Sequence, residues 1–191
     1  MKRLAAALSL ALFMLGCVAQ LSREAKQVRA MTDLDMPSCH NIKTVWSEPW
    51  NDVFSYRTPD ADFEDAFNEA LNAVAAVGGN AYRISGGSGL GYMVLEAWHC
   101  DWEGDASPIL ARSTSEPKEI YSIDRPKCSF VTTLTEASNW GITEKRNTSS
   151  AKRDVIKQVQ NAGGDSYFIV DSFWNSGAGT AFIIVEAWRC K

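Results

Sequence analysis

The sequence has few residues suited to catalysis. It contains two histidines, His40 and His99, and none of its five cysteines lies in a C-x-x-C pair. That spacing is typical of redox-active dithiols, so the sequence does not predict a thiol oxidoreductase. No acids and bases recur at a spacing that indicates general acid-base chemistry. We therefore expect a protein that has neither enzymatic activity nor a cofactor.

The chain also lacks a long hydrophobic segment and an excess of basic residues. Its most apolar segment, Leu4 to Leu15, is twelve residues long, is interrupted only by Ser9, and is too short to span a bilayer. Its 19 Lys and Arg residues are outnumbered by 23 Asp and Glu residues. A chain with this charge has no basic surface with which to seek nucleic acid, so we expect no nucleic-acid partner.

The N-terminal residues have the pattern of an export signal. A basic start precedes the apolar run, and Gly16 and Cys17 follow it. This order predicts a lipoprotein signal peptide over residues 1–16, cleaved before Cys17, which then carries palmitate-type acyl chains. Cleavage after Ala19 by ordinary signal peptidase is the alternative, and it would release a soluble periplasmic protein.

The rest of the sequence contains an internal repeat. AVAAVGGNAYRI (73–84) matches QVQNAGGDSYFI (158–169), and GYMVLEAWHC (91–100) matches AFIIVEAWRC (181–190). Self-similarity with conserved order and spacing indicates two copies of one structural unit.

These matches set the boundaries of the chain's parts. The first repeat spans 39–102 and the second 118–191. Residues 103–117 are rich in Ser, Thr and Pro and have the composition of a surface linker. Residues 17–38 hold the lipidated cysteine and a spacer. KQVRAM (26–31) and KEIYSI (118–123) occupy matching positions and are candidates for short leading strands.

Each repeat contains one predicted helix, marked by apolar residues at steps of three and four. In the first repeat these residues are Phe63, Phe67, Ala70, Leu71, Val74 and Val77; in the second they are Val155, Ile156, Val159 and Ala162. We expect Asp60 or Asp62 to cap the start of the first helix. The pairs Gly78-Gly79 and Gly163-Gly164 are expected to supply the left-handed conformation that ends each helix.

Four cysteines remain after cleavage, and in an exported protein they indicate two disulfides. If a strand follows the first cysteine of each repeat, bridges Cys39–Cys100 and Cys128–Cys190 join the first strand to the last, which must run antiparallel beside it. The predicted fold is α+β, with two tandem β-α-β-β units. Each unit is a small sheet with its last strand central and one helix packed on it, closed by a disulfide.

These features together resemble a known family. A lipidated cysteine, a cysteine-headed strand, a helix ending in GGNAY (78–82) and a last strand ending in cysteine are similar to the Rcs stress-sensor (RcsF-like) lipoproteins of the outer membrane and related small lipoproteins of uncharacterised function. The resemblance covers residues 26–102 and 118–191, and it implies the fold, the lipid and the disulfides. Val18, in place of the aspartate that retains lipoproteins in the inner membrane, implies delivery to the outer membrane. Unlike the stress sensor, this chain has two copies with one bridge apiece and no long Pro-rich tether.

Two glutamates recur inside apolar strands. Glu96 shares a strand face with Trp98, and Glu186 shares the matching face with Trp188. A carboxylate at such a position is costly unless it is paired or hydrated. These four residues are candidates for binding a ligand or partner. The alternative, which we favour, is a structural salt bridge or hydrogen-bonded pair between the two units.

The remaining candidates have simpler explanations. Cys39-His40 and His99-Cys100 would form a Cys2His2 metal site if reduced, but export favours the disulfide. Trp46, Trp50, Trp102, Trp140 and Trp174 fall near predicted strand ends or loops, where aromatic rings bind sugars or proteins as well as pack cores. SGGSGLG (85–91) leads into a strand rather than a helix, so it predicts a hairpin turn and not a phosphate loop.

The sequence thus predicts a non-enzymatic lipoprotein of the cell envelope, anchored in the outer membrane and facing the periplasm. Its partners would be the membrane, through the N-terminal lipid, and another envelope protein that it serves as sensor or accessory module. The alternative is a module that binds a glycan, either peptidoglycan or lipopolysaccharide.

Overall fold

The computed structural model describes residues 19–47, 59–87, 92–102, 116–139, 143–176 and 179–190, with backbone alone for 59–61. We call the described part up to residue 102 module 1 and the part from residue 116 module 2. The predicted signal peptide, Cys17, Trp50, Trp140, residues 88–91 of the glycine-rich segment and residues 103–115 of the linker lie outside the described residues.

Module 1 contains one four-stranded sheet and one α-helix. Its elements are η2 (Ala25–Gln27), β1 (Arg29–Ala30), η3 (Met36–Ser38), β2 (Cys39–Trp46), α2 (Pro59–Ala76), β3 (Ala81–Gly86) and β4 (Val94–Cys100). The strand order is β1-β3-β4-β2, with β1 parallel to β3 and β4 antiparallel to both of its neighbours. The last strand is therefore internal, as predicted, and the leading strand exists.

Module 2 repeats this arrangement. Its elements are β5 (Lys118–Glu119), η4 (Ser122–Lys127), β6 (Cys128–Ser138), α3 (Glu144–Asn161), β7 (Ser166–Asn175) and β8 (Thr180–Cys190). The strand order is β5-β7-β8-β6, and β5 is parallel to β7. The predicted α+β class with two tandem units is confirmed.

The disulfides pair as predicted, Cys39–Cys100 in module 1 and Cys128–Cys190 in module 2. In each module the two cysteines are cross-strand partners, with Cα atoms 4.0 Å and 4.3 Å apart. Each bridge fastens the start of the edge strand to the end of the last strand.

The two glycines of each pair have different roles. Gly78 and Gly163 have φ of 82° and 86°, so the first glycine of each pair supplies the left-handed turn. A Cβ on Gly79 or Gly164 would come within 2.8 Å and 2.9 Å of a valine of the preceding helix. The second glycine is therefore needed for the close approach of helix end and last strand, a reason that the sequence analysis missed.

Most of the predicted apolar stripe residues are buried in the helices, but Val77 and Ala162 lie one residue beyond the helix ends, and the predicted N-cap of α2 is wrong. Phe63, Phe67, Ala70, Leu71 and Val74 of α2 are buried, as are Val155 and Val159 of α3. However, α2 begins at Pro59. Asp60 and Asp62 therefore lie inside the first turn and not at the N-cap. Proline suits the first helical position because its missing N–H has no helical partner there.

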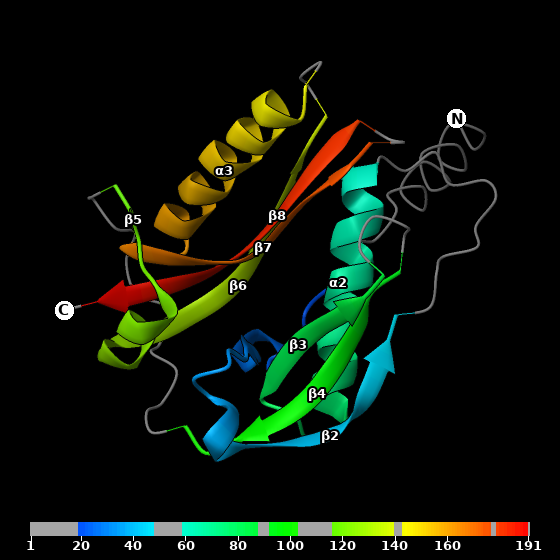
Figure 1. Ribbon diagram of the computed structural model, residues 1–191, viewed down its shortest axis with the longest axis vertical. Coiled ribbons are helices and arrows are strands. Elements are labelled where there is room, and N and C mark those ends of the chain that lie inside the picture. Colours follow the sequence, from blue (N-terminus) through cyan, green and yellow to red (C-terminus); the bar gives the residue numbers. More distant parts are fainter. Residues whose placement is uncertain are drawn as a thin grey trace, which may run out of the picture.

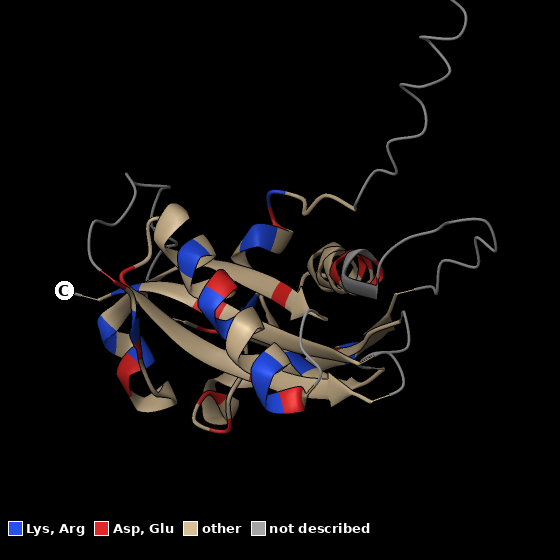
Figure 2. Ribbon diagram, turned by 90° about the horizontal axis from the view of Figure 1, so that it is seen from above, with Lys and Arg blue, Asp and Glu red and all other residues tan. Residues whose placement is uncertain are grey.

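The two modules pack into one body because α2 is covered on both sides. Toward its own sheet, Phe67 meets Tyr82 with ring centroids 5.7 Å apart; toward module 2, Phe63 meets Phe182 at 4.6 Å. Figure 1 shows α2 and α3 on opposite sides of the strands of module 2. The order of layers is the sheet of module 1, α2, the sheet of module 2, and α3. Charged residues of both signs, most of them basic, lie along α3, the outermost layer (Figure 2).

Candidate functional site: two matched Glu-Trp faces

The repeated strands carry the same internal hydrogen bond. Trp98 Nε1 donates to Glu96 Oε2 at 3.2 Å in β4, and Trp188 Nε1 donates to Glu186 Oε2 at 3.1 Å in β8. Strand alternation puts each pair on the sheet face opposite the module's own helix, because Leu95 and Val185 point to the helix side. We call the surface around Glu96 and Trp98 the Glu-Trp face of module 1. The surface around Glu186 and Trp188 is the Glu-Trp face of module 2.

The Glu-Trp face of module 2 binds module 1. Glu186 is 0% exposed, and its Oε1 accepts a hydrogen bond from the backbone N–H of Ala30 at 2.5 Å. Arg125 Nη2 lies 3.3 Å from Glu186 Oε2 and donates to the carbonyl of Ala30 at 2.6 Å. The side chains of module 2 thus bond both free backbone groups of one residue in module 1.

Those backbone groups are free because Ala30 lies on an edge strand. Its neighbours Arg29 and Met31 donate their N–H groups to Asn80 and Tyr82 beside β3. Since backbone groups alternate in direction along a strand, the N–H and C=O of Ala30 point away from β3. Buried edge groups without partners are costly. Glu186 and Arg125 together take the place of a neighbouring strand.

Two arginines and an aromatic cluster surround Glu186. The guanidinium of Arg125 lies 5.2 Å from the centroid of the Trp188 ring. That of Arg29 lies 3.6 Å from the Trp102 ring and 5.9 Å from the Trp188 ring. Cations over aromatic faces are attracted by the ring quadrupole. The network is buried, because the side chain of Arg125 is 6% exposed.

Burial dominates the electrostatics of this network. It raises the pKa of the Glu186 carboxyl above its ordinary value, although Arg125, the N–H of Ala30, Arg29 and the Trp188 indole all favour the carboxylate. Burial also lowers the pKa of Arg29 to about 10. Glu186 and Trp188 are therefore structural contacts between the modules, the alternative that the sequence analysis favoured.

The Glu-Trp face of module 1 is different, because Glu96 and Trp98 are only half-buried. Arg125 lies three residues before Cys128, and the matching position in module 1 is Met36, which is 40% exposed. Among the described residues Glu96 has no ion pair. The same pair of side chains is thus present without an arginine at the position of Arg125.

The surroundings of Glu96 are open and mixed in polarity. Its cross-strand neighbours, Thr44 on β2 and Arg83 on β3, are exposed. Arg83 lies 4.0 Å from Asp33, another exposed group. Trp46, at the end of β2, is 64% exposed. A large aromatic surface beside a carboxylate is typical of a binding surface.

The histidine-cysteine cluster forms, but as a disulfide. His40 and His99 are cross-strand partners with ring centroids 5.4 Å apart. Cys39 and Cys100 are bonded to each other, so neither supplies a thiolate ligand. Within the described ranges no three residues among His, Cys, Asp and Glu gather to hold a metal ion.

The other predicted aromatic and glycine-rich features have clear positions. Trp102 follows β4 and stacks with Arg29, and Trp174 is half-buried near the end of β7. Of these described loop tryptophans, Trp46 alone is strongly exposed. Gly87 has a φ of 89° directly after β3, as a turn requires.

A hydrogen-bonded clamp that the sequence analysis missed holds the N-terminal segment on α2. Asn72 accepts from the N–H of Ser22 at 2.8 Å and donates to the carbonyl of Gln20 at 3.0 Å. Asn68 donates to the carbonyl of Ala19 at 3.0 Å, and Asp65 accepts the N–H of Ala19. The signal was present in the sequence, because Asp65, Asn68 and Asn72 recur on one helical face at steps of three and four.

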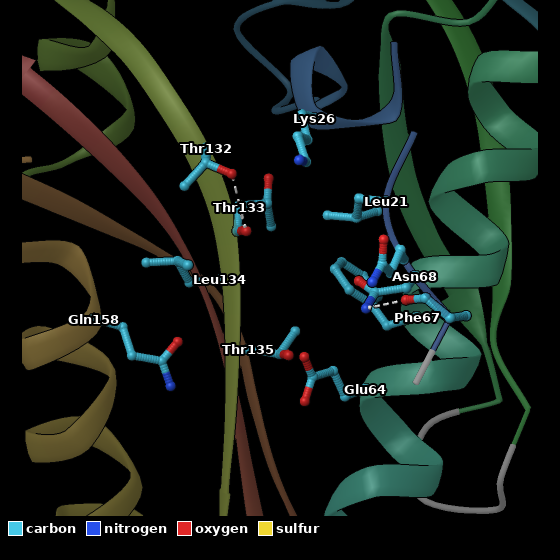
Figure 3. A pocket seen from close by; sticks show the side chains of 12 residues that line it. Leu21, Lys26, Glu64, Phe67, Asn68, Thr132, Thr133, Leu134, Thr135 and Gln158 are labelled. Carbon is cyan, nitrogen blue, oxygen red and sulfur yellow. Dashed lines mark hydrogen bonds between the residues drawn. The ribbon is translucent and has the colours of Figure 1, made fainter. Parts of the chain in front are cut away.

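A cleft of about 790 Å³ opens beside this clamp, between α2 and β6. Figure 3 shows its polar lining, with Thr133 and Thr135 on one side and Glu64 and Asn68 on the other. Ala19, Gln20 and Leu21 form part of its wall, and Lys26 also lines it. The lining is mixed, because Leu21, Phe67 and Leu134 add apolar surface to the hydroxyl, amide and charged groups.

Comparison of the chain with protein-family models, curated proteins and solved structures found no match. None of the helices in the described part of the chain is long and apolar enough to cross a membrane. The residues and their geometry therefore carry the functional argument.

Proposed function

We propose that this protein is a non-enzymatic lipoprotein of the outer membrane that binds another envelope protein as a sensor or accessory module. It faces the periplasm, is anchored by acyl chains on Cys17, and belongs with the RcsF-like lipoproteins that its repeats resemble. The observation that carries the proposal is the clamp between α2 and the residues directly behind Cys17.

The clamp leaves little free chain between the proposed lipid and the folded modules. The backbone of Ala19 is hydrogen-bonded to Asp65 and Asn68. The two residue steps from Cys17 to Ala19 can span at most about 7 Å. A lipid on Cys17 would hold module 1 close to the membrane surface. The partner of such a protein is itself found at or near that membrane, which favours a short-range role over one that spans the periplasm.

The packing of the modules supports an interaction role. Two modules held together by Phe63, Phe182 and the Glu186 network present one body with a defined outer surface. The buried ion pair between Arg125 and Glu186 serves the contact between modules. The Glu-Trp face of module 1 presents the same pair of groups, a carboxylate and an indole, at the outer surface.

The first experiment is the mass of the N-terminal peptide from membrane-purified protein. We expect acylated Cys17, and the Cys17→Ala variant should move to the soluble fraction. The second step is crosslinking on intact membranes, with the Cys17→Ala protein as control, which should enrich one envelope protein. An unlipidated chain starting at Gln20, or no enriched protein from lipidated material, would each contradict the proposal.

Glycan binding is the second candidate, and the cleft between α2 and β6 is the observation that favours it. Its volume and its hydroxyl and amide lining suit a short saccharide, and Trp46 offers an exposed ring elsewhere on module 1. Peptidoglycan fragments or lipopolysaccharide should then bind the wild type in calorimetric titrations, since no tryptophan lines the cleft to report binding by fluorescence. Thr135→Val should weaken the binding if the cleft is the site. Absence of binding with both glycans would exclude this candidate.

A further inference from the structure

The contact between the modules shows what a Glu-Trp pair binds. Module 1 brings two groups to Glu186 and Trp188, the strand-edge N–H of Ala30 and the guanidinium of the neighbouring Arg29, which lies 5.9 Å from the Trp188 ring centroid and attracts the carboxylate. Module 2 adds its own Arg125, whose guanidinium pairs with the carboxylate and lies over the indole ring. A carboxylate that accepts an indole N–H keeps its other oxygen for such a donor.

Module 1 repeats the receiving half of this contact. Glu96 and Trp98 have the same spacing, strand position and internal hydrogen bond as Glu186 and Trp188. The half-buried carboxylate of Glu96 has no arginine from η3, where Met36 replaces Arg125. Arg83, opposite Glu96 on β3, lies 4.0 Å from Asp33 and forms no ion pair with Glu96. The Glu96 carboxylate is therefore available to a cation from outside.

A second copy of the chain is a poor ligand for this face. The residue of module 2 that matches Ala30 is Glu119, because Arg29 pairs with Ala81 and Lys118 pairs with Ser166 at equivalent positions. Glu119 already binds Lys152 at 2.7 Å. Its carboxylate would lie beside Glu96 in a head-to-tail contact, and like charges repel. The charged outer surface of α3 also differs from the apolar face of α2 that module 2 covers.

We propose that the Glu-Trp face of module 1 binds a different protein, through a segment that presents an unpaired strand-edge N–H next to an arginine. This proposal rests on the proposed function and names the site and chemistry of the partner. The carboxylate of Glu96 accepts the N–H and pairs with the guanidinium, which stacks on Trp98. Trp46 extends the contact area at the end of β2.

Site-specific photocrosslinking in the source organism tests the proposal. Position 44 is suited to benzoylphenylalanine, because Thr44 is exposed and directly opposite Glu96. We expect one main adduct with another protein, mapped by peptide sequencing to within a few residues of an arginine in an edge strand. Glu96→Gln should lower the adduct about tenfold, the loss expected for one charge-assisted contact. Glu144→Gln, at an exposed glutamate in module 2, is the matched control and should change nothing.

A charge swap between Glu96 and the arginine of the partner is the decisive test. Glu96→Arg should abolish the adduct, and replacing the mapped arginine of the partner by glutamate should restore it. An unchanged melting temperature of each variant shows that the fold is intact. The proposal is overturned by an adduct that is insensitive to Glu96→Gln, by no adduct, or by an adduct to a glycan, a second copy or this chain's own linker. If the membrane crosslinking described above still enriches an envelope protein, these results remove the site and leave the proposed function standing.

Discussion

Strands β4 and β8 have nearly the same sequence, yet their surroundings differ. In β8, Ile183 and Val185 pack toward α3 while Phe182 and Ile184 pack toward α2, so both faces are buried. In β4, Leu95 and Ala97 pack toward α2, whereas Glu96 and Trp98 stay half-buried on the other face. One amino-acid pattern thus serves as a strand covered on two faces and as a strand covered on one.

The two helices differ in the same way, because α2 is covered on two sides and α3 on one. Helix α2 lies between two sheets and contributes Phe63 and Phe67 to contacts on both sides. Helix α3 packs on one sheet through Ala151, Val155 and Val159, and its outer residues are polar. Stacking therefore ends at α3, whose charged surface would not receive another module. At the other end of the stack, the sheet of module 1 keeps a binding face.

The largest expected effect comes from removing either disulfide. The bridges close segments of nearly equal length, with separations of 61 and 62 residues. The chain-entropy model gives a stabilisation of about 4 kcal/mol for each. We expect Cys39→Ala/Cys100→Ala and Cys128→Ala/Cys190→Ala to lower the free energy of unfolding by similar amounts in denaturant titrations. A loss below about 1 kcal/mol in one module would show that the two bridges are not equivalent.

The next effect separates the two glutamates. Glu186→Ala leaves the buried guanidinium of Arg125 and the N–H of Ala30 without their partner, which costs about 3 kcal/mol. Glu96→Ala removes a half-buried carboxylate and should cost less than about 1 kcal/mol. Equilibrium unfolding of the two variants measures this difference. Equal losses would mean that the contact between modules does not depend on Glu186.

A smaller effect is expected for the clamp on α2. Asn72→Ala removes two hydrogen bonds to the N-terminal segment, both near the surface, and should cost about 1 kcal/mol. Amide exchange at Ser22 should accelerate, because its N–H loses its acceptor. Asn161→Ala, at an exposed position on α3, is the control and should leave this amide unchanged. A protected Ser22 amide in Asn72→Ala would show that other contacts hold the segment.

The smallest effect is a pH dependence that comes from Glu186 in module 2. Burial raises the pKa of Glu186, so on raising the pH the unfolded chain loses this proton before the folded one. The stabilisation is present below the ordinary glutamate pKa and is lost as the pH rises through the folded pKa. As the pH rises above the ordinary glutamate pKa, the stability of the wild type relative to Glu186→Gln should therefore decline and then level off. A difference that grows with pH would show that Arg125 outweighs burial.

Much of the fold was predictable because its signals are local. The apolar stripe of Phe67, Leu71 and Val74, the glycine after each helix and the spacing of the cysteines each depend on a few neighbouring residues. The N-cap prediction was wrong because α2 begins at Pro59, one residue before Asp60. The exact ends of helices depend on small energy differences. The pairing of cysteines followed from the repeat, since each copy contains one at either end.

The candidate site was only half predictable for the same reason. Glu96 and Glu186 were found because each interrupts an apolar strand. Their partners were not, since Arg125 and Ala30 are 61 and 156 residues away from Glu186 in the sequence. The clamp residues Asn68 and Asn72 recur on one helix face, but their spacing does not show which backbone groups they bind, since those groups are 49 to 52 residues away.

By itself the sequence determined two copies of one disulfide-closed unit and the places of helix, turn and last strand, because periodicity and glycine act over a few residues. The tertiary structure decided which copy of the Glu-Trp pair is buried and which stays open. That choice depends on the order of stacking, in which one helix is enclosed and one sheet face is left outside, and such an order arises from contacts between residues far apart in the chain.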